Sequence, residues 1–127
     1  MNVTVYTVNA FIDAEAEPGG NPAGVVLAAD GLGSDIRQAI AARIGLSETA
    51  FVSTSSIASR RLEFFTPTQQ IAHCGHATIA SFWLMQHLGQ LRSFCVHTFA
   101  PANDLECLAH VGFIEQGIQI LTHQCAT

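Results

Sequence analysis

The chain has 127 residues, of which 49% are hydrophobic and 12% charged, and its formal net charge is −5. This length corresponds to one modest domain with enough apolar residues for a core. Five arginines and no lysine make no basic stripe, so no nucleic-acid partner is expected. Without a bilayer-length apolar stretch or a signal-peptide pattern, the sequence predicts a cytoplasmic protein that has no membrane partner.

The first segments are predicted to be two strands joined by a loop. Residues 3–8 alternate with the two-residue period of a half-buried strand. The segment Glu15–Pro22 combines acidic residues with proline and glycine, a composition typical of a loop. Residues 23–27 are short and apolar, and they are predicted to form a second, buried strand.

A helix is predicted after the turn at residues 30–33. Ser34 or Asp35 can cap its first N–H groups. Gly45 is placed to end it. The face that we expect to be buried carries Ile36, Ile40 and Ile44.

The middle of the chain predicts two more strands and a buried helix. The strands cover residues 49–52 and 61–65. The helix opens at Cys74-Gly75-His76, is apolar nearly all round and ends near Gly89. This order predicts an α+β domain in which a curved, largely antiparallel sheet wraps around the buried helix. After a possible strand at 94–98, only residues 117–121 suggest a further apolar segment.

Three segments, in this order and at this spacing, carry a family resemblance. They are Gly-Asn-Pro-Ala-Gly-Val at 20–25, Leu-Ser-Glu-Thr-Ala-Phe at 46–51, and Phe-Phe-Thr-Pro-Thr at 64–68 running into Cys-Gly-His-Ala-Thr at 74–78. Together they resemble the N-terminal lobe of the PhzF (phenazine biosynthesis-like) family, which shares the fold of diaminopimelate epimerase. The resemblance covers residues 1–98. It implies one lobe of a cofactor-independent isomerase or epimerase, with a partial barrel around a central helix.

The resemblance assigns the catalytic role to Glu48. In the family, the glutamate of this motif is the general acid/base that moves a proton between carbons of a small unsaturated carboxylic acid. Leu46, Ala50 and Phe51 flank Glu48. An apolar pocket penalises the charged form of a carboxyl group, which suits the group to give and take a proton near neutral pH. The alternative is an exposed glutamate near a helix end.

The start of the buried helix is predicted to bind the substrate carboxylate. Free N–H groups and the positive end of the helix dipole gather there. Gly75 lets the backbone approach the ligand closely, and His76 can add a hydrogen bond or relay a proton. The matching histidine of the family lines the substrate pocket. The alternative is a histidine that only caps the helix.

Two further residues are substrate-binding candidates with structural alternatives. Related epimerases and racemases use a cysteine at the position of Cys74 for proton transfer, and a helix start favours the thiolate. A small buried thiol that packs as a hydrophobic group is the other interpretation. Family members have the asparagine that matches Asn21 near the mouth of the site. Asparagine before proline is also a common turn signal.

The resemblance ends at about residue 98. Residues 99–127 are interpreted as a divergent segment after a truncation or frameshift, and the family's second lobe is then absent. We therefore expect little or no activity from this chain alone. We also expect two chains to associate through the exposed cleft face. The hypothesis predicts family-like sequence in another reading frame after about codon 98.

Two other functions remain open at this point. A non-catalytic remnant would bind a carboxylate or a partner chain and be stabilised without turnover. A metal-binding module is suggested by close Cys/His pairs, but their spacing differs from that of usual zinc sites. We therefore predict no metal and no cofactor. The pairs are Cys74 with His76, Cys95 with His97, Cys107 with His110, and His123 with Cys125.

Overall fold

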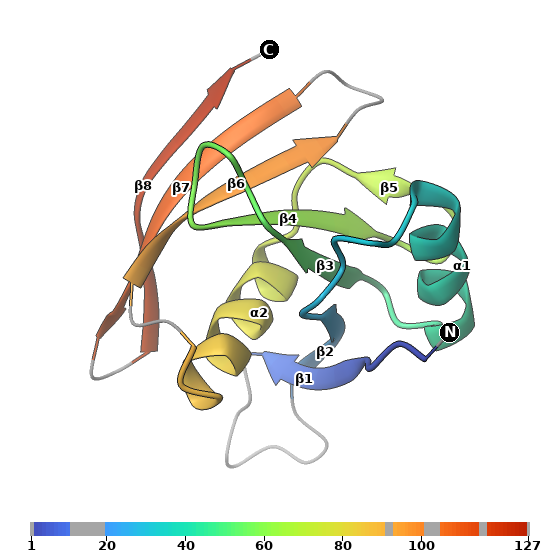
Figure 1. The fold of residues 1–127 in the computed structure, drawn as a ribbon. Helices are drawn as coiled ribbons and strands as arrows, with labels where there is room; N and C mark the ends of the chain where they lie inside the picture. The colour runs from blue at the N-terminus through green and yellow to red at the C-terminus, as the bar shows by residue number, and fades with distance from the viewer. Residues whose placement is uncertain (1, 11–19, 91–92, 101–104, 115–116, 127) are drawn as a thin grey trace.

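The computed structural model describes residues 2–10, 20–90, 93–100, 105–114 and 117–126, and the side chains of the first two ranges. As predicted, the fold is α+β, with strands and two helices (Figure 1). In chain order the elements are β1 (Tyr6–Ala10), β2 (Asn21–Val26), α1 (Ser34–Ile44), β3 (Thr49–Ser53), β4 (Arg60–Phe65), β5 (Gln70–Ile71), α2 (Gly75–His87), β6 (Ser93–Ala100), β7 (Leu105–Ile114) and β8 (Gly117–Ala126).

The described strands form one curved sheet in the order β1-β2-β3-β4-β6-β7-β8, with β5 paired to β4. The pairings β2–β3 and β4–β6 are parallel, and the others are antiparallel. The sheet curves around α2, while α1 packs against β3 and β4 (Figure 1). The predicted, largely antiparallel sheet around a central helix is confirmed.

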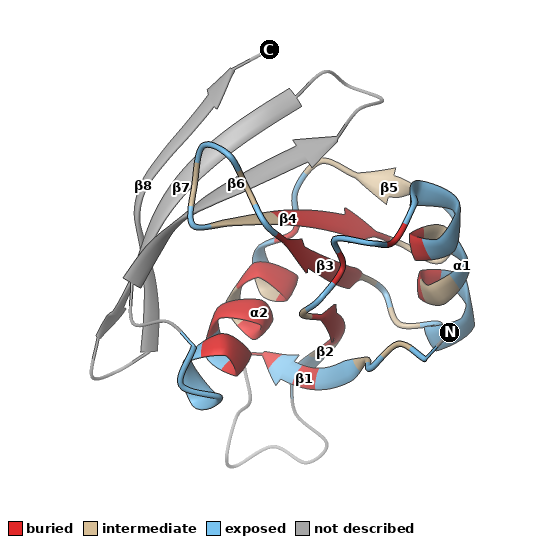
Figure 2. Cartoon of the chain, viewed as in Figure 1, coloured by how far each residue is buried: buried red, intermediate tan, exposed pale blue. Residues whose placement is uncertain are grey.

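The central strands are buried on both faces (Figure 2). Alternate residues of β3 point to opposite sides of the sheet, so Ala50 and Val52 pack with α2. Phe51 packs on the other side, in the cluster that contains Ala41 of α1. This double burial explains the apolar runs Ala50-Phe51-Val52 in β3 and Phe64-Phe65 in β4, whereas the buried Glu63 of β4 is paired with Arg37.

Helix α2 is the central element of the larger core cluster. Its side chains Phe82, Leu84 and Met85 are buried among residues of β2, β3 and β4. The near absence of a polar face in its sequence is therefore explained by burial. Trp83 is the exception, with 48% of its surface exposed. The chain turns after the helix at Gly89, whose φ is 73°.

The predicted start and buried face of α1 are wrong by one position. The residue that caps the helix is Gly33, and no side chain forms a capping hydrogen bond. Arg37 and Ala41 are buried, whereas Ile36 and Ile44 are exposed. The helix is turned in this way because Arg37 points toward the sheet and forms an ion pair with Glu63 of β4. Gly45 ends the helix as predicted, with φ 72° and its N–H bonded to the carbonyl of Ala41.

Two other predictions need correction. Asn21 and Pro22, expected in a loop, begin β2, because the chain turns at Gly20 and both residues then pair with β1. Residues 105–114 and 117–126, which show no clear alternation of polar and apolar residues, form the hairpin β7–β8. The predicted loop residues 15–19 lie outside the described residues.

In the part of the chain that the structure describes, neither helix has the length and hydropathy that a membrane crossing requires.

Candidate active site

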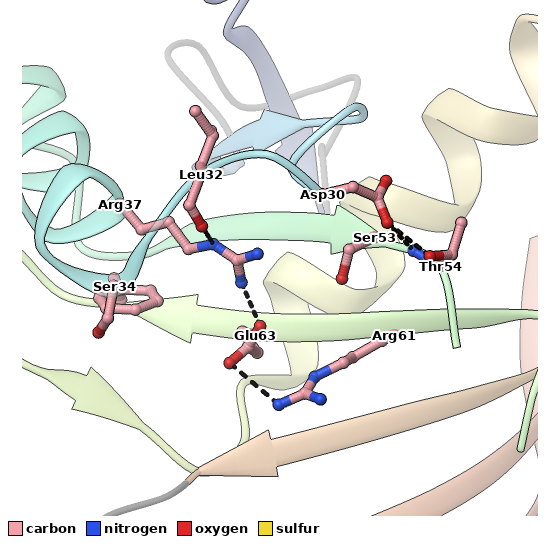
Figure 3. Close-up of a pocket in the computed structure, with 9 residues that line it drawn as sticks. Asp30, Leu32, Ser34, Arg37, Ser53, Thr54, Arg61 and Glu63 are labelled. Atoms are coloured by element: carbon pink, nitrogen blue, oxygen red, sulfur yellow. Dashed lines mark hydrogen bonds and ion pairs between the residues drawn. The ribbon is translucent and has the colours of Figure 1, made fainter. Parts of the chain in front are cut away.

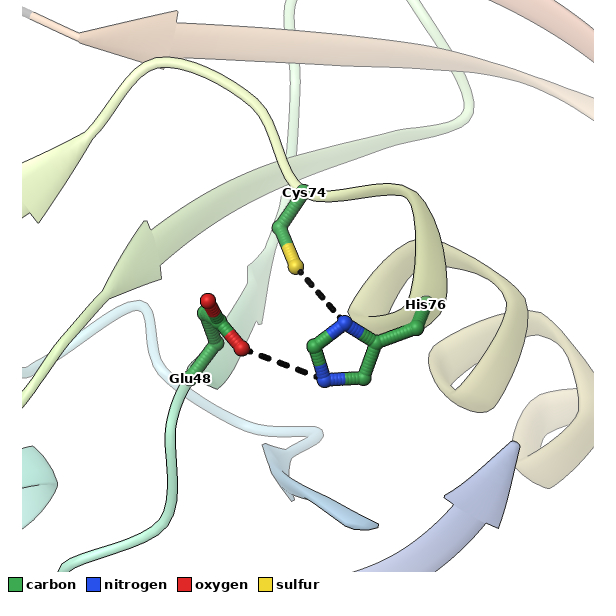
Figure 4. Close-up of side chains that lie close together, drawn as sticks. All are labelled: Glu48, Cys74 and His76. Carbon is green, nitrogen blue, oxygen red and sulfur yellow. Dashed lines mark hydrogen bonds and ion pairs between the residues drawn. The ribbon is translucent and has the colours of Figure 1, made fainter. Parts of the chain in front are cut away.

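Three of the predicted site residues meet at the start of α2 (Figure 4). The Nε2 atom of His76 lies 3.2 Å from the Oε2 atom of Glu48. On the other side of the same ring, Nδ1 of His76 lies 3.3 Å from the sulfur of Cys74. The imidazole ring therefore stands between a carboxylate and a thiol, and all three groups can hold or move a proton.

Glu48 is positioned by the parallel pairing of β2 and β3. It directly precedes β3, and its backbone carbonyl accepts a hydrogen bond of 3.1 Å from the N–H of Gly24 in β2. Its neighbour Thr49 is fully buried, which fixes the backbone at this point. The Glu48 side chain is 21% exposed, so it lies at the edge of the core with access to a ligand.

His76 and Glu48 are close without being hydrogen bonded. Their facing atoms, Nε2 and Oε2, are both inaccessible to solvent and have no hydrogen-bond partner. The 3.2 Å contact satisfies the distance of an ion pair, but the two groups are not aligned for a hydrogen bond. Buried polar atoms in proteins are nearly always hydrogen bonded. Each of the two atoms therefore has hydrogen-bonding capacity that the described residues do not use.

Cys74 is a buried thiol whose pKa lies above, rather than below, its ordinary value. Burial raises the pKa of the Cys74 thiol, and the charge of Glu48 raises it further. The backbone amides of Ala77 and His76 act in the opposite direction without overcoming these effects. The side chain also forms no regular capping hydrogen bond with the helix. Cys74 therefore remains protonated at neutral pH.

The start of α2 offers free backbone donors. The first intrahelical hydrogen bond runs from the N–H of Thr78 to the carbonyl of Cys74, at 3.1 Å. The N–H groups that precede it, at residues 75–77, have no acceptor within the helix. Above Gly75, an added Cβ atom would meet nothing within 4 Å. The space above Gly75 is therefore open, and a helix start with such space beside it suits an anion. The backbone N–H groups of His76 and Ala77 also act on the sulfur of Cys74.

Asn21 is not brought into this group. It begins β2 at the same end of the sheet, three residues before Gly24, but its side chain is exposed. In the described part of the chain, no hydrogen bond or ion pair joins the Asn21 side chain to Glu48, Cys74 or His76. The structure therefore assembles four of the five predicted site residues and leaves the fifth outside.

The structure also reveals a polar cavity that the sequence did not predict. It has a volume of about 370 Å³ and lies beside α1, β3 and β4 (Figure 3). The buried Arg37 pairs with Glu63 and donates two hydrogen bonds of 2.9 Å to the carbonyls of Ala29 and Leu32. Nothing local in the sequence signals this pair, because its two residues lie on different elements. The network connects α1 to the sheet.

The rim of this cavity holds one perturbed carboxylate. Asp30 accepts hydrogen bonds from the hydroxyl and the N–H of Thr54, at 2.5 and 2.8 Å. These bonds hold the pKa of Asp30 below its ordinary value. They close the turn before α1 onto the end of β3.

Comparison with known proteins places the chain in a family. Residues 8–107 match the model of the phenazine biosynthesis-like proteins, PhzC-PhzF. The chain belongs to this family. It is 47% identical over 79 residues to the uncharacterized isomerase YfhB of Bacillus subtilis, a match that covers 61% of this chain and 27% of that protein. The uncharacterized isomerase YddE of Escherichia coli is 43% identical over 84 residues, or 66% of this chain and 28% of that protein.

Solved structures of the PhzF family share the fold. The Bacillus anthracis phenazine biosynthesis protein superimposes with a TM-score of 0.76 at 33% identity, over 93% of this chain and 40% of that one. The match to a predicted epimerase from Pseudomonas aeruginosa has a TM-score of 0.70 at 17% identity, and it covers 92% of this chain and 41% of the epimerase chain. At this identity, the match shows a similar fold and nothing more. The chain thus spans well under half the length of either of these two proteins.

Proposed function

We propose that this PhzF-family chain forms one face of an isomerase or epimerase site that moves a proton on a small carboxylic acid. The single observation that carries the proposal is the meeting of Glu48 and His76, 3.2 Å apart, at the start of α2. A proton acceptor beside a set of backbone donors is what such a reaction requires. No cofactor takes part.

The proposed chemistry divides between the helix start and the two side chains. The substrate carboxylate accepts hydrogen bonds from the N–H groups above Gly75. Glu48 removes a proton from a carbon close to that carboxylate. The negative charge that develops is delocalised onto the carboxylate oxygens, where the N–H groups stabilise it. His76 hydrogen bonds to Glu48 or passes the proton on. The proton then returns to another carbon or to the other face of the same one.

Cys74 plays a supporting part in this proposal. Its protonated thiol is a poor base, so the first proton transfer falls to Glu48 rather than to the sulfur. The thiol contacts the imidazole ring at 3.3 Å and helps to orient it. Because Cys74 carries a free thiol, the proposal fits a reducing, cytoplasmic location.

The chain spans 27–28% of the two bacterial isomerases that it matches. In this proposal, Glu48, Cys74, Gly75 and His76 form one side of the site. With that side facing water, the N–H donors and Glu48 lose much of the advantage that a closed cleft gives them. We therefore propose that this chain alone is weakly active and that closing the cleft restores activity.

A second copy of the chain is the proposed cover. An apolar groove of about 350 Å³ lies between α2 and β1, lined by Trp83, Ile79 and Val8 among others. The half-exposed Trp83 gives this face apolar surface to bury in a homodimer. Sedimentation over a range of protein concentrations should show association, and Trp83→Glu should weaken it. A monomer at all concentrations would refute the dimer and leave the proton-transfer proposal intact.

The proton-transfer proposal is tested by isotope exchange. Deuterium uptake from D2O into a small unsaturated carboxylic acid is followed by NMR, for the parent chain and for Glu48→Gln. Loss of a general base should slow the exchange by about 100- to 10,000-fold. Asp35→Asn, an exposed change of the same kind on α1, serves as the control and should keep the parent rate. Equal exchange in the parent chain and in Glu48→Gln would remove Glu48 from the mechanism.

A binding protein without turnover is the alternative, favoured by the openness of the helix start above Gly75. In that case the same acids raise the thermal unfolding midpoint while no deuterium enters them.

A further inference from the structure

The three side chains at the start of α2 are also arranged as metal ligands. One ligand atom from each of Glu48, Cys74 and His76 lies within 4.8 Å of the other two. Carboxylate, thiolate and imidazole are the donor groups that zinc prefers. Reactive zinc sites use three protein ligands and leave a fourth position for water or another small ligand. Figure 4 shows the three side chains converging from two separate elements.

The unpartnered atoms of the site supply a second, independent observation. Oε2 of Glu48 and Nε2 of His76 are buried without a hydrogen-bond partner, although they lie 3.2 Å apart. In a tetrahedral zinc site, bonds of about 2.0–2.2 Å place neighbouring nitrogen and oxygen ligands about 3.4 Å apart. The 3.2 Å between Nε2 of His76 and Oε2 of Glu48 is therefore close to the distance between two ligand atoms of one zinc ion.

The third ligand is the thiol of Cys74. Its sulfur lies 3.3 Å from Nδ1 of His76, which is not the ring nitrogen that faces Glu48, and it is nearly inaccessible to water. Because one ion binds only one nitrogen of the ring, the imidazole has to turn slightly when all three groups bind the same ion. When the sulfur binds a divalent ion, the thiol proton is released to solvent and a sulfur–metal bond replaces the S–H bond. No electron is transferred, so the step needs no oxidant or reductant.

We propose that Glu48, Cys74 and His76 bind a zinc-class divalent cation, and that the bound ion stops proton transfer at this site. The binding part depends on the ligand geometry alone. The inhibition part rests on the proposed function, because the ion occupies the base, Glu48, and its neighbour, His76. The ion is an inhibitor here, and the reaction itself is still expected to need no metal.

Cobalt is the probe for binding. Co²⁺ is titrated into the reduced, metal-free full chain. Tetrahedral coordination gives visible absorption bands, and ligation by Cys74 gives a thiolate-to-cobalt charge-transfer band in the near ultraviolet. Competition with Zn²⁺ then yields the zinc affinity. Cys74→Ser should abolish the charge-transfer band. Glu48→Gln and His76→Gln should each weaken binding at least about 10- to 100-fold, since changes outside the ligand shell already cost that much.

Two variants serve as matched controls. His87→Gln changes an exposed histidine at the far end of α2, where the ring stacks on Trp83, and it should leave the cobalt spectrum unchanged. Asp35→Asn changes an exposed carboxylate on α1 and keeps all three ligands, so it should also bind cobalt as the parent does. The unfolding midpoint of each variant without metal shows that the fold persists. If Cys74→Ser does not fold, the nearly isosteric Glu48→Gln carries the test.

The outcomes separate this inference from the proposed function. A charge-transfer band that persists in Cys74→Ser and His76→Gln would assign the ion to other cysteines and histidines of the chain and overturn the inference. Absence of any band in the parent chain would do the same. A band with no deuterium exchange would sustain the metal site and refute the proposed function. Exchange that continues at saturating Zn²⁺ would refute the inhibition.

Discussion

A methyl group added at Gly24 should destabilise the protein by forcing β2 away from β3. A Cβ atom at this position would lie 2.8 Å from Oγ1 and 3.0 Å from Cγ2 of Thr49, well inside the usual contact distance of about 3.5–4.0 Å between carbon atoms. Thr49 is fully buried and β-branched, so its side chain has no other position to adopt. The strand itself must move.

The magnitude follows from two opposing effects. Overpacking in a well-packed interior costs about 1–3 kcal/mol. Replacing glycine with alanine recovers about 0.4–1 kcal/mol by restricting the unfolded chain. The net loss for Gly24→Ala is therefore about 1–2 kcal/mol. With a urea m-value of about 2 kcal/mol per molar, the unfolding midpoint should fall by roughly 0.5–1 M.

A second substitution provides the control. Thr49→Ala removes both clashing atoms and leaves only an ordinary 3.4 Å contact to Cβ. Alone it should be close to neutral, because the Oγ1 atom that it removes is buried without a hydrogen-bond partner. The double variant should recover most of the stability lost in Gly24→Ala. A double variant that is no more stable than Gly24→Ala would refute the steric explanation, and an unchanged midpoint in Gly24→Ala would refute the contact itself.

Two further predictions concern the polar cavity beside α1. Arg37→Met should cost about 3–5 kcal/mol in urea unfolding, because it leaves the carboxylate of Glu63 buried with weaker partners; a loss below about 1 kcal/mol would contradict this account of the ion pair. Thr54→Val should return the pKa of Asp30 part of the way to its ordinary value in an NMR titration, because one of its two hydrogen bonds is lost. Since the folded pKa is lowered, the Asp30 contribution to stability is present above about pH 3.9 and is lost as the pH falls through the folded pKa. The stability of the parent should therefore approach that of Thr54→Val in acid.

Local sequence signals predicted the elements whose structure is decided locally. Gly45 ends α1 with a positive φ, as a glycine beyond a helix C-terminus usually does. The apolar run that became α2 has almost no polar side chain to place in water, so it had to be buried. In both cases, the residues from which the element was predicted also make the contacts that form it.

Predictions failed where a partner distant in sequence decides the structure. The isoleucine pattern suggested a buried face for α1, but the pairing of Arg37 with Glu63 rotates the helix by one position. The hairpin β7–β8 has little alternation of its own and owes its place to pairing with β6. Neither partner can be identified from a window of adjacent residues.

The candidate site lies between these two cases. Composition and periodicity alone would leave Glu48 as an ordinary glutamate between a helix and a strand, and only the family motifs connected it to His76. The structure supplies the physical link, since Gly24 holds the carbonyl of Glu48 in β2–β3 pairing at 3.1 Å. The motifs could not predict the raised pKa of Cys74, because it depends on burial and on the charge of Glu48.

The parallel pairing of β2 and β3 explains why the site lies where it does. Parallel strands run in the same direction, and the register pairs Gly24 with Thr49. The residue before β3 therefore lies beside Ala23 and Gly24 of β2. Helix α2 crosses behind these strands and begins at the edge of the sheet where β3 starts, as the contact between His76 and Glu48 requires. An antiparallel β2–β3 pair would carry Glu48 to the opposite edge, away from the helix N–H groups. The close glycine-to-threonine packing of Gly24 on Thr49 is therefore part of the site, although neither side chain meets a ligand.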